Sequence, residues 1–209
     1  MNKYKDLIII GAGGHGRVVA DIAARVGNYQ SIAFLDDKEL PQTFPYPYLG
    51  KCDTAEKYLD AYDIAVAIGN GEVRQRIMVS LAEHGAHFAT IIAPDAVIAA
   101  DVRIGAGTII LPGTVINTGT VIGKGAIINT ASSVDHDCSI GDFCHVAVGA
   151  HICGTVHVGH RTWVGAGATV INNITICSDC MIGAGAVVVN DIETSGLYVG
   201  VPAKRQHRI

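Results

Sequence analysis

The sequence predicts two domains: a small α/β domain with a parallel sheet over residues 1–90, and a parallel β-helix over residues 91–209 that ends in a C-terminal tail. Three observations lead to this prediction. A strand, a glycine-rich turn and a helical stretch follow one another near the start of the chain. An aliphatic residue then recurs at every sixth position between Ile98 and Val188. The 25 glycines and the charged fraction of only 16% suit a solenoid that is dense in turns.

The first half of the α/β domain carries a nucleotide-binding pattern. Residues 5–10 form an apolar run that predicts a buried strand, and residues 11–16, GAGGHG, match the pattern GxGxxG. Residues 17–26 place apolar side chains on one helical face, and residues 31–35 predict a second strand that ends in Asp36 and Asp37. Acids at this distance after the glycines complete the sequence pattern of a dinucleotide site. The alternative is a turn whose glycines only supply a backbone conformation that other residues rarely adopt.

Length argues against a full dinucleotide fold. After a proline-rich stretch, the patterns predict a helix over 54–60, a strand over 64–68, a helix over 72–84 and a strand over 89–92. These elements make one Rossmann-like mononucleotide half, whereas NAD binding needs two such halves. We therefore expect one nucleotide at the carboxyl ends of the strands. The glycine-rich backbone would approach phosphate or sugar, and Asp36 or Asp37 would contact ribose or base.

The six-residue period fits neither a helix nor a plain alternating strand. It is typical of a hexapeptide β-helix, in which each hexad makes one short strand and one turn, and three hexads close a coil of eighteen residues. The β-branched residue of each hexad is expected to fill the inside of the coil, and a small residue four positions later is expected at a corner. The aliphatic series is Ile98, Ile104, Ile110, Ile116, Ile122, Ile128, Val134, Ile140, Val146, Ile152, Val158, Val164, Val170, Ile176, Ile182 and Val188.

His136 is the strongest catalytic candidate in the solenoid. It lies two positions after an inward-facing Val134, so it should point outward from a turn, between Asp135 and Asp137. Flanking carboxylates can raise its basicity and fix its tautomer. Gly154 lies eighteen residues further on, so its backbone N–H could lie beside the histidine as an oxyanion donor. A base next to a backbone donor suits acyl transfer, whereas the alternative is a solvated turn histidine.

Composition argues against several classes of function. The net charge of −4 gives no support to nucleic-acid binding, because such proteins carry a basic face. The sequence shows neither a signal-peptide pattern nor an apolar run long enough for a membrane span, so a cytoplasmic location is expected. Cys177 and Cys180 form a lone CxxC pair without a second pair to complete a zinc site, and we expect no metal.

The hexad array resembles the left-handed β-helix acyltransferases. The resemblance rests on three stretches of the solenoid: residues 129–138 (NTASSVDHDC), 141–145 and 148–150. It also rests on residues 11–16, 34–37 and 67–70 of the α/β domain and on residues 199–204 near the C-terminus. Together they resemble the sugar-nucleotide N-acetyltransferases of the bacillosamine pathway, which are grouped with sialic-acid O-acetyltransferases. The likeness covers nearly the whole chain.

The resemblance implies roles for individual residues. It implies that His136 is the general base and that Asp137, where the family often has Glu, raises its basicity, while Asn129 helps to hold the substrate. For acetyl-CoA it implies His145, Gly154, Ala166, Ala184 and Lys204, with Arg205 beside the last. For the nucleotide sugar it implies Gly14, His15, Gly16, Asp36, Asp37 and Gly69.

The function implied by the resemblance is an N-acetyltransferase for bacterial glycan synthesis. It would use acetyl-CoA as co-substrate and no metal, and would acetylate the amine of a UDP-4-amino-dideoxy sugar by direct attack. One alternative is an O-acetyltransferase that acts on sialic acid or another nucleotide sugar. The others are a zinc enzyme similar to the γ-type carbonic anhydrases and a non-catalytic trimeric scaffold or nucleotide sensor. The choice of sugar and of base is left open.

Spacing adds a prediction about assembly. His136 and His145 are nine residues apart, which is half a coil, so they should lie on opposite sides of one prism. If both serve one site, they must come from neighbouring subunits. Solenoids of this class resemble parallel homotrimers, so we expect a homotrimer with its active sites between subunits.

Overall fold

A computed structural model of the chain describes residues 5–206. The chain divides into two compact units, Met1–Pro94 and Asp95–Ile209, so this division falls four residues after the predicted one. The outer ends of the predicted domains, residues 1–4 and 207–209, lie outside the described residues. Within residues 5–206, every helix is too short or too polar to cross a membrane.

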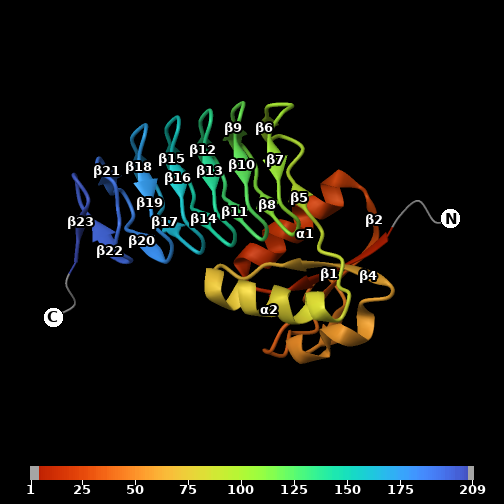
Figure 1. The fold of residues 1–209 in the computed structure, drawn as a ribbon. Helices are drawn as coiled ribbons and strands as arrows, with labels where there is room; N and C mark the ends of the chain where they lie inside the picture. Colours follow the sequence, from red (N-terminus) through yellow and green to blue (C-terminus); the bar gives the residue numbers. More distant parts are fainter. Residues whose placement is uncertain (1–4, 207–209) are drawn as a thin grey trace. The chain divides into compact units, whose positions relative to one another are not determined.

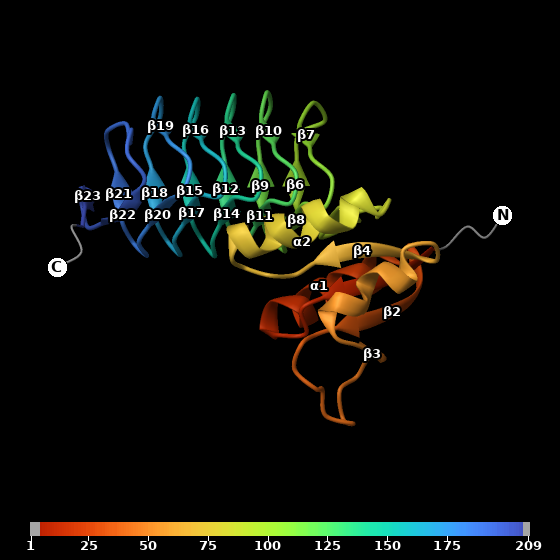
Figure 2. The ribbon, with the colours of Figure 1, turned by 60° about the horizontal axis from the view of Figure 1, so that its bottom comes forward.

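The first unit is built on a four-stranded sheet with the order β3-β2-β1-β4, in which each neighbouring pair is parallel (Figure 2). Strand β1, one of the two inner strands, is apolar over its last four residues, and Leu7, Ile8, Ile9 and Ile10 are completely buried. Its elements in chain order are β1 (Lys5–Ile10), α1 (Gly14–Val26), β2 (Tyr29–Leu35), β3 (Tyr48–Gly50), the 3-10 helix η1 (Cys52–Tyr58), β4 (Tyr62–Val66) and α2 (Gly71–Glu83). The predicted parallel α/β sheet is thus confirmed.

Several predicted elements of this unit need correction. Helix α1 begins at Gly14, three residues before the predicted start, so His15 lies in the first helical turn. Strand β3 follows the proline-rich stretch and was not predicted; it lies at the sheet edge, where a nearby proline is tolerated. The predicted helix over 54–60 is a 3-10 helix that begins at Cys52. The strand predicted over 89–92 is shorter in the structure: it covers only β5 (Ile91–Ile92), which belongs to one of the solenoid sheets.

The second unit is a β-helix, whose coils follow one another in chain order (Figure 1). Its short strands form three stacked sheets, as predicted. One sheet contains β6 (Val97–Ile98), β9 (Val115–Ile116), β12 (Ser133–Val134), β15 (His151–Ile152), β18 (Thr169–Val170) and β21 (Val187–Val188). A second contains β7 (Arg103–Ile104), β10 (Val121–Ile122), β13 (Ser139–Ile140), β16 (His157–Val158) and β19 (Thr175–Ile176). The third contains β5, β8 (Ile109–Ile110), β11 (Ile127–Ile128), β14 (His145–Val146), β17 (Trp163–Val164), β20 (Cys180–Ile182), β22 (Gly196–Val199) and β23 (Lys204–Arg205).

Strand register confirms the coil of eighteen residues. Val134 pairs with Ile152 in parallel, and Ile128 pairs with Val146 in the same way. The inward-facing aliphatic side chains from Ile110 onward are at most 3% exposed, so they form one continuous apolar column. Burial of apolar surface stabilises a fold by about 25 cal/mol per Å². The buried column is therefore the main source of stability of the unit.

The corner positions explain the short side chains that follow each aliphatic residue. Thr108 is fully buried, and its hydroxyl donates to the carbonyl of Gly123 at 2.7 Å. Cys144 is also buried, and its Sγ lies 3.0 Å from the carbonyl oxygen of Gly159. Where the corner residue carries a hydroxyl or a thiol, it therefore also satisfies a backbone carbonyl.

A left-handed backbone recurs at the third position after the aliphatic residue in most hexads. Glycine occupies it at Gly107, Gly113 and Gly119 with φ near 70°. In other coils the same conformation is adopted by larger residues: Ala131, Asp137, Phe143, Thr155, Arg161, Asn173 and Asp179. The solenoid therefore imposes this turn whether or not glycine is present, at some cost in backbone strain.

Candidate active site

His136 lies at the corner between β12 and β13, in the turn where the sequence placed it. Its side chain is 52% exposed, and its Nδ1 lies 2.9 Å from Oδ2 of Asp137. The backbone N–H of His136 donates to Oδ1 of Asp135 at 2.8 Å. Because the carboxylate of Asp137 accepts a hydrogen bond from Nδ1, the lone pair of a neutral ring remains on Nε2. Nε2 is therefore the atom that can take up a proton.

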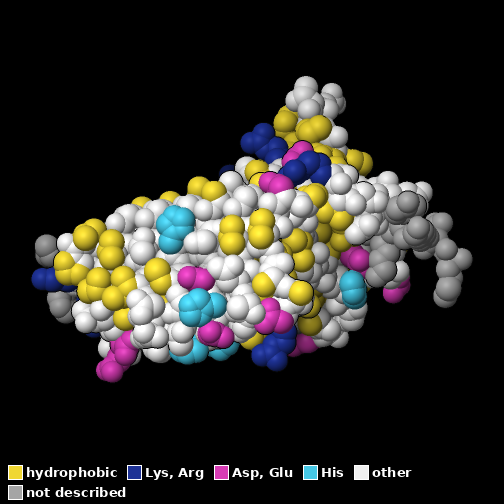
Figure 3. Space-filling view, turned by 90° about the horizontal axis from the view of Figure 1, so that it is seen from above, with side chains coloured by type: hydrophobic (Ala, Val, Ile, Leu, Met, Phe, Trp, Pro, Cys, Tyr) yellow, Lys and Arg dark blue, Asp and Glu magenta, His cyan; other side chains and the backbone are white. Residues whose placement is uncertain are grey.

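The surrounding carboxylates make this histidine more basic. The hydrogen bond to Asp137 is the largest cause that raises the pKa of His136, and the negative charges of Asp135 and Asp137 add to it, against partial desolvation. The hydrogen bond from the Asn117 side chain lowers the pKa of Asp135, so this carboxylate stays ionised beside the histidine. Figure 3, which views the molecule from above Figure 1, shows histidine and acidic side chains gathered on one part of the solenoid surface.

Gly154 lies beside the imidazole, as the eighteen-residue spacing predicts. The backbone N–H of Thr155 donates to the carbonyl of His136 at 2.9 Å, which locks the two turns together. A Cβ on Gly154 would lie 2.5 Å from Nε2 of His136, so only glycine leaves room for the ring in its present position.

Substitution of Gly154 by alanine should therefore displace the ring of His136. We expect turnover to fall by about 10- to 10²-fold, because a displacement near 1 Å at a reacting group can have that effect. Steady-state kinetics of Gly154→Ala would show this. The same substitution in a His136→Ala background should cause no further loss, and an additive loss would mean that Gly154 acts through something other than this ring.

Removal of the Asp137 carboxylate should change the pH dependence. The pKa of His136 is raised, so the neutral base of the wild type is lost as pH falls through this raised value. In Asp137→Ala the hydrogen bond that contributes most to the raised pKa of His136 is gone. The acid limb of kcat/KM should therefore move to lower pH, while the rate at high pH falls. Profiles of kcat/KM from about pH 5.5 to pH 9 would test this, since they report free-enzyme pKa values. A limb at the wild-type position would contradict it.

His145 belongs to a second group on a different part of the prism. It is 7% exposed on β14, and its ring lies 4.1 Å from that of Trp163 between centroids. Asn129 contacts His145 and not His136: its Nδ2 lies 2.9 Å from Nε2 of His145. The next corner along carries Ala166 and Ala184, both exposed, and the carbonyl of Ala166 accepts the N–H of Gly185 at 2.9 Å.

Residues predicted for one site thus form two groups on one chain. His136, Asp137 and Gly154 occupy the corners that follow β12 and β15, whereas His145, Ala166 and Ala184 lie on or directly after β14, β17 and β20. Lys204 is exposed on β23, which pairs antiparallel with β22 near the end of the described chain.

The glycine-rich turn of the first unit contains two kinds of glycine. Gly11 has φ +102°, and a Cβ on Gly16 would collide with the carbonyl of Gly11, so the fold itself requires both. A Cβ on Gly13 or Gly14 would meet nothing within 4 Å. Packing within the described chain does not explain these two glycines, whereas close approach of a ligand to the N-terminus of α1 would.

His15 is held in its neutral form. Burial, followed by the positive charge of Arg74, lowers the pKa of His15 to about 4. Arg74 is fully buried and donates to the carbonyls of Ile68 and Gly69 at 2.6 and 2.9 Å. Sequence reasoning missed Arg74, although an arginine next to the apolar face of the predicted helix was a signal that could have identified it.

The two acids after β2 are partly engaged within the fold. Asp36 accepts the N–H of Ala12 at 2.7 Å and that of Lys38 at 2.8 Å, so it fixes the glycine-rich turn. Asp37 accepts the N–H of Cys52 at 3.1 Å. Each carboxylate oxygen has two lone pairs, so both acids can still accept a hydrogen bond from a sugar or base.

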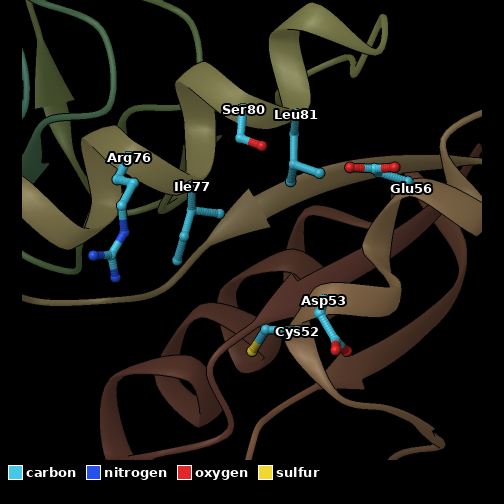
Figure 4. Close-up of a pocket in the computed structure, with 7 residues that line it drawn as sticks. All are labelled: Cys52, Asp53, Glu56, Arg76, Ile77, Ser80 and Leu81. Carbon is cyan, nitrogen blue, oxygen red and sulfur yellow. The ribbon is translucent and has the colours of Figure 1, made fainter.

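A cavity of about 310 Å³ lies between η1 and α2 and was also missed by sequence reasoning. Figure 4 shows the α2 side chains facing those of η1 across it. Its lining is Cys52, Asp53, Glu56, Arg76, Ile77, Ser80 and Leu81. Cys52, through its N–H to Asp37, connects this cavity to the predicted sugar-nucleotide residues.

Comparisons with known proteins identify the proteins that this chain resembles. The family model described as PglD N-terminal domain matches residues 6–81. The acetyltransferase domain of PglB from Neisseria gonorrhoeae FA1090 is 38% identical, with a TM-score of 0.94 over 98% of this chain and 100% of that chain. A second structure of that domain is a complex with acetyl coenzyme A; its identity is 38%, its TM-score 0.93, and it covers 97% of this chain and 100% of that one.

Two further structures extend the likeness. A histidine-to-alanine mutant of GDP-perosamine N-acetyl transferase from Caulobacter crescentus, in complex with CoA and GDP-perosamine, is 35% identical over 97% of each chain, with a TM-score of 0.92. WeeI from Acinetobacter baumannii AYE is 29% identical over 97% of this chain and 100% of that chain, with a TM-score of 0.89. The chain therefore belongs to the family of sugar N-acetyltransferases that join a PglD-type N-terminal domain to a hexapeptide-repeat β-helix, and it is an acetyltransferase, as predicted.

Proposed function

We propose that this chain transfers the acetyl group of acetyl-CoA to the amine of a nucleotide-linked amino sugar, with His136 as general base. The observation that carries the proposal is the His136 turn, where Asp137 holds Nδ1 at 2.9 Å and Gly154 leaves room beside Nε2. A basic, exposed imidazole suits general-base catalysis of acyl transfer to an amine, and a backbone N–H at the Gly154 turn would serve as the oxyanion donor.

Acetyl-CoA is the proposed donor. Support comes from the PglB acetyltransferase domain in complex with acetyl coenzyme A, and from the Caulobacter transferase in complex with CoA. We assign His145, Gly154, Ala166 and Ala184 to the donor, and Lys204 to its phosphates. The two alanines are exposed on successive turns, where a narrow chain can lie against the backbone.

A UDP-linked 4-amino-dideoxy sugar is the proposed acceptor, bound through the first unit. The open space above Gly13 and Gly14 at the start of α1 supports a phosphate position there. The neutral ring of His15 and the carboxylates of Asp36 and Asp37 offer hydrogen bonds to sugar or base, and the Gly69 carbonyl is fixed by Arg74. Asn129 is assigned to the same substrate.

In the proposed mechanism, Nε2 of His136 accepts a proton from the amine as the nitrogen attacks the thioester carbonyl. The Asp137 carboxylate stabilises the imidazolium through Nδ1–H, and a backbone N–H at the Gly154 turn stabilises the charge on the carbonyl oxygen. The imidazolium then returns its proton to the departing sulfur. The acetyl group ends on nitrogen, and the proton ends on the CoA thiol.

We further propose that each active site forms between neighbouring subunits of a homotrimer. On one chain, His136 lies in the corner between β12 and β13, whereas His145 lies on β14, where Asn129 contacts it. A site that uses both groups therefore needs a second copy of the chain.

The test is a panel of nucleotide sugars incubated with acetyl-CoA, with free thiol release as the readout. The panel contains UDP-linked and GDP-linked 4-amino sugars, the matching hydroxyl sugars, and sialic acid with its CMP form. We expect turnover with an amino sugar and the highest kcat/KM with a UDP-linked one. Turnover confined to hydroxyl acceptors would replace N-acetylation by O-acetylation, and absence of turnover with all of them would overturn the proposal.

A further inference from the structure

The turn that carries His136, residues 135–138, is called the catalytic turn below. The turn of residues 117–119 lies directly beside it, one coil nearer the N-terminus. The N–H of Asp137 donates to the carbonyl of Thr118 at 3.0 Å, so the two turns are stacked in register. In the opposite direction the N–H of Gly119 and the hydroxyl of Thr118 both donate to Asp101 Oδ2 at 2.8 Å. The turn is thus held on both sides and can act as a fixed support.

Asn117 contacts the catalytic turn through one carboxylate. Its Nδ2 donates at 2.8 Å to Oδ1 of Asp135, the same oxygen that accepts the backbone N–H of His136. Asn117 is exposed, so burial does not require this hydrogen bond for stability. It fixes the orientation of Asp135 and thereby the start of the turn that carries the imidazole.

Gly119 contacts the other carboxylate. It has φ +72°, and a Cβ at this position would collide with Oδ1 of Asp137. The other oxygen of that carboxylate holds Nδ1 of His136. Any side chain at position 119 would therefore push the Asp137 carboxylate out of the position from which it orients the base.

Another glycine turn gives a matched comparison. Gly113 has φ +70°, nearly the same backbone conformation, yet a Cβ there would meet Ala131 at 3.7 Å, which is ordinary contact. The two positions share the same conformational strain on substitution, and only Gly119 faces the Asp137 carboxylate.

We propose that Asn117 and Gly119 are positioning residues for the transfer reaction: Asn117 orients Asp135, and Gly119 leaves the space in which the Asp137 carboxylate holds the base. This inference rests on the proposed role of His136. The charged groups that face the imidazole are Asp135 and Asp137 from its own turn. The preceding coil contributes the uncharged turn 117–119 backed by Asp101, and the following coil contributes uncharged Gly154 and Thr155.

The first test compares Gly119→Ala with Gly113→Ala in the full chain, on the acceptor that the panel identifies. We expect kcat/KM of Gly119→Ala to fall by about 10- to 10²-fold, as for other misplaced catalytic groups, while that of Gly113→Ala stays within about two-fold of wild type. The acid limb of the pH profile should move to lower pH in Gly119→Ala alone. In an Asp137→Ala background, Gly119→Ala should cause no further loss.

Asn117→Ala provides a second variant, which stays informative if Gly119→Ala does not fold. We expect kcat to fall by about 10-fold with little change in the KM for acetyl-CoA, and the loss should vanish in an Asp135→Ala background. The thermal unfolding temperature of every variant distinguishes a variant that does not fold from one that folds but misplaces the Asp135 or Asp137 carboxylate.

The outcomes separate this inference from the proposed function. If His136→Ala is inactive while Gly119→Ala and Asn117→Ala match Gly113→Ala in rate and pH profile, the positioning role is overturned and the function stands. If His136→Ala retains full turnover, the proposed role of the histidine fails, and the positioning role with it.

Discussion

Replacement of His136 by alanine should lower turnover by about 10²- to 10⁴-fold, the usual contribution of a positioned general base. The loss should appear in kcat, because the imidazole takes up the amine proton during the reaction and is not needed to hold the donor. Affinity for acetyl-CoA should change little. Thiol release under saturating substrates measures the first quantity, and calorimetric titration with acetyl-CoA measures the second.

His157→Ala is the matched control for this variant. His157 is also an exposed solenoid histidine; it lies on β16, and its Nδ1 lies 2.8 Å from Oγ of Ser139. It should retain turnover close to wild type. Wild-type turnover in His136→Ala would refute the general-base role, whereas equal losses in both variants would indicate a general effect on the solenoid.

Two inactive variants should restore activity when they are co-expressed. One variant carries His136→Ala, and the other carries Asn129→Ala together with His145→Ala. If each site takes His136 from one chain and the other two residues from its neighbour, random assortment leaves about a quarter of the sites intact in a symmetric ring. The whole co-expressed population should therefore show about a quarter of wild-type turnover, and mixed trimers isolated by a different tag on each chain should show about a third, because each keeps one intact site of three.

The control for complementation is co-expression of two variants with the same defect. His136→Ala paired with His136→Asn leaves every site without its base, so this mixture should remain inactive. Absence of recovery in the first mixture, despite verified mixed oligomers, would mean that each site draws these residues from one chain. A fully active monomer would contradict the interface site in a second way.

The solenoid could be predicted from the sequence almost residue by residue, because its packing rule is periodic. Each aliphatic side chain must face inward once per hexad, and the register is then determined for the whole array. The same period correctly placed His136 in an outward turn beside Gly154. Periodicity converts sequence spacing into spatial proximity, so the sequence alone was enough to bring His136 and Gly154 together.

The α/β unit was harder to predict, because its contacts are set by chain crossings and not by a repeat. Strand β3 is three residues long and pairs with β2 only at a sheet edge, so it left a weak pattern beside its prolines. Arg74 lies on an amphipathic helix, and its burial beside the Gly69 carbonyl depends on where the β4–α2 loop passes. The cavity between η1 and α2 likewise requires the positions of two separate segments.

Asn117 and Gly119 were missed for a different reason. Their spacing from Asp135 and Asp137 is eighteen residues, so the period places them correctly, yet their function depends on side-chain direction. Which oxygen of Asp137 faces Gly119 and which holds His136 is a matter of one rotamer. A sequence pattern determines neighbours, but it does not determine orientation.

The left-handed position that recurs in successive hexads has an evolutionary consequence. Because alanine, aspartate, phenylalanine, threonine, arginine and asparagine all occupy it without altering the coil, one corner residue can be exchanged while the scaffold stays unchanged. Stacked strands repeat at about 4.8 Å, so a functional group moved by one coil shifts along the axis by that distance. Insertion or deletion of eighteen residues would then change the distance between the general base and the acyl-donor site in uniform steps. The same fold could in this way adapt to acyl donors and acceptors of different length.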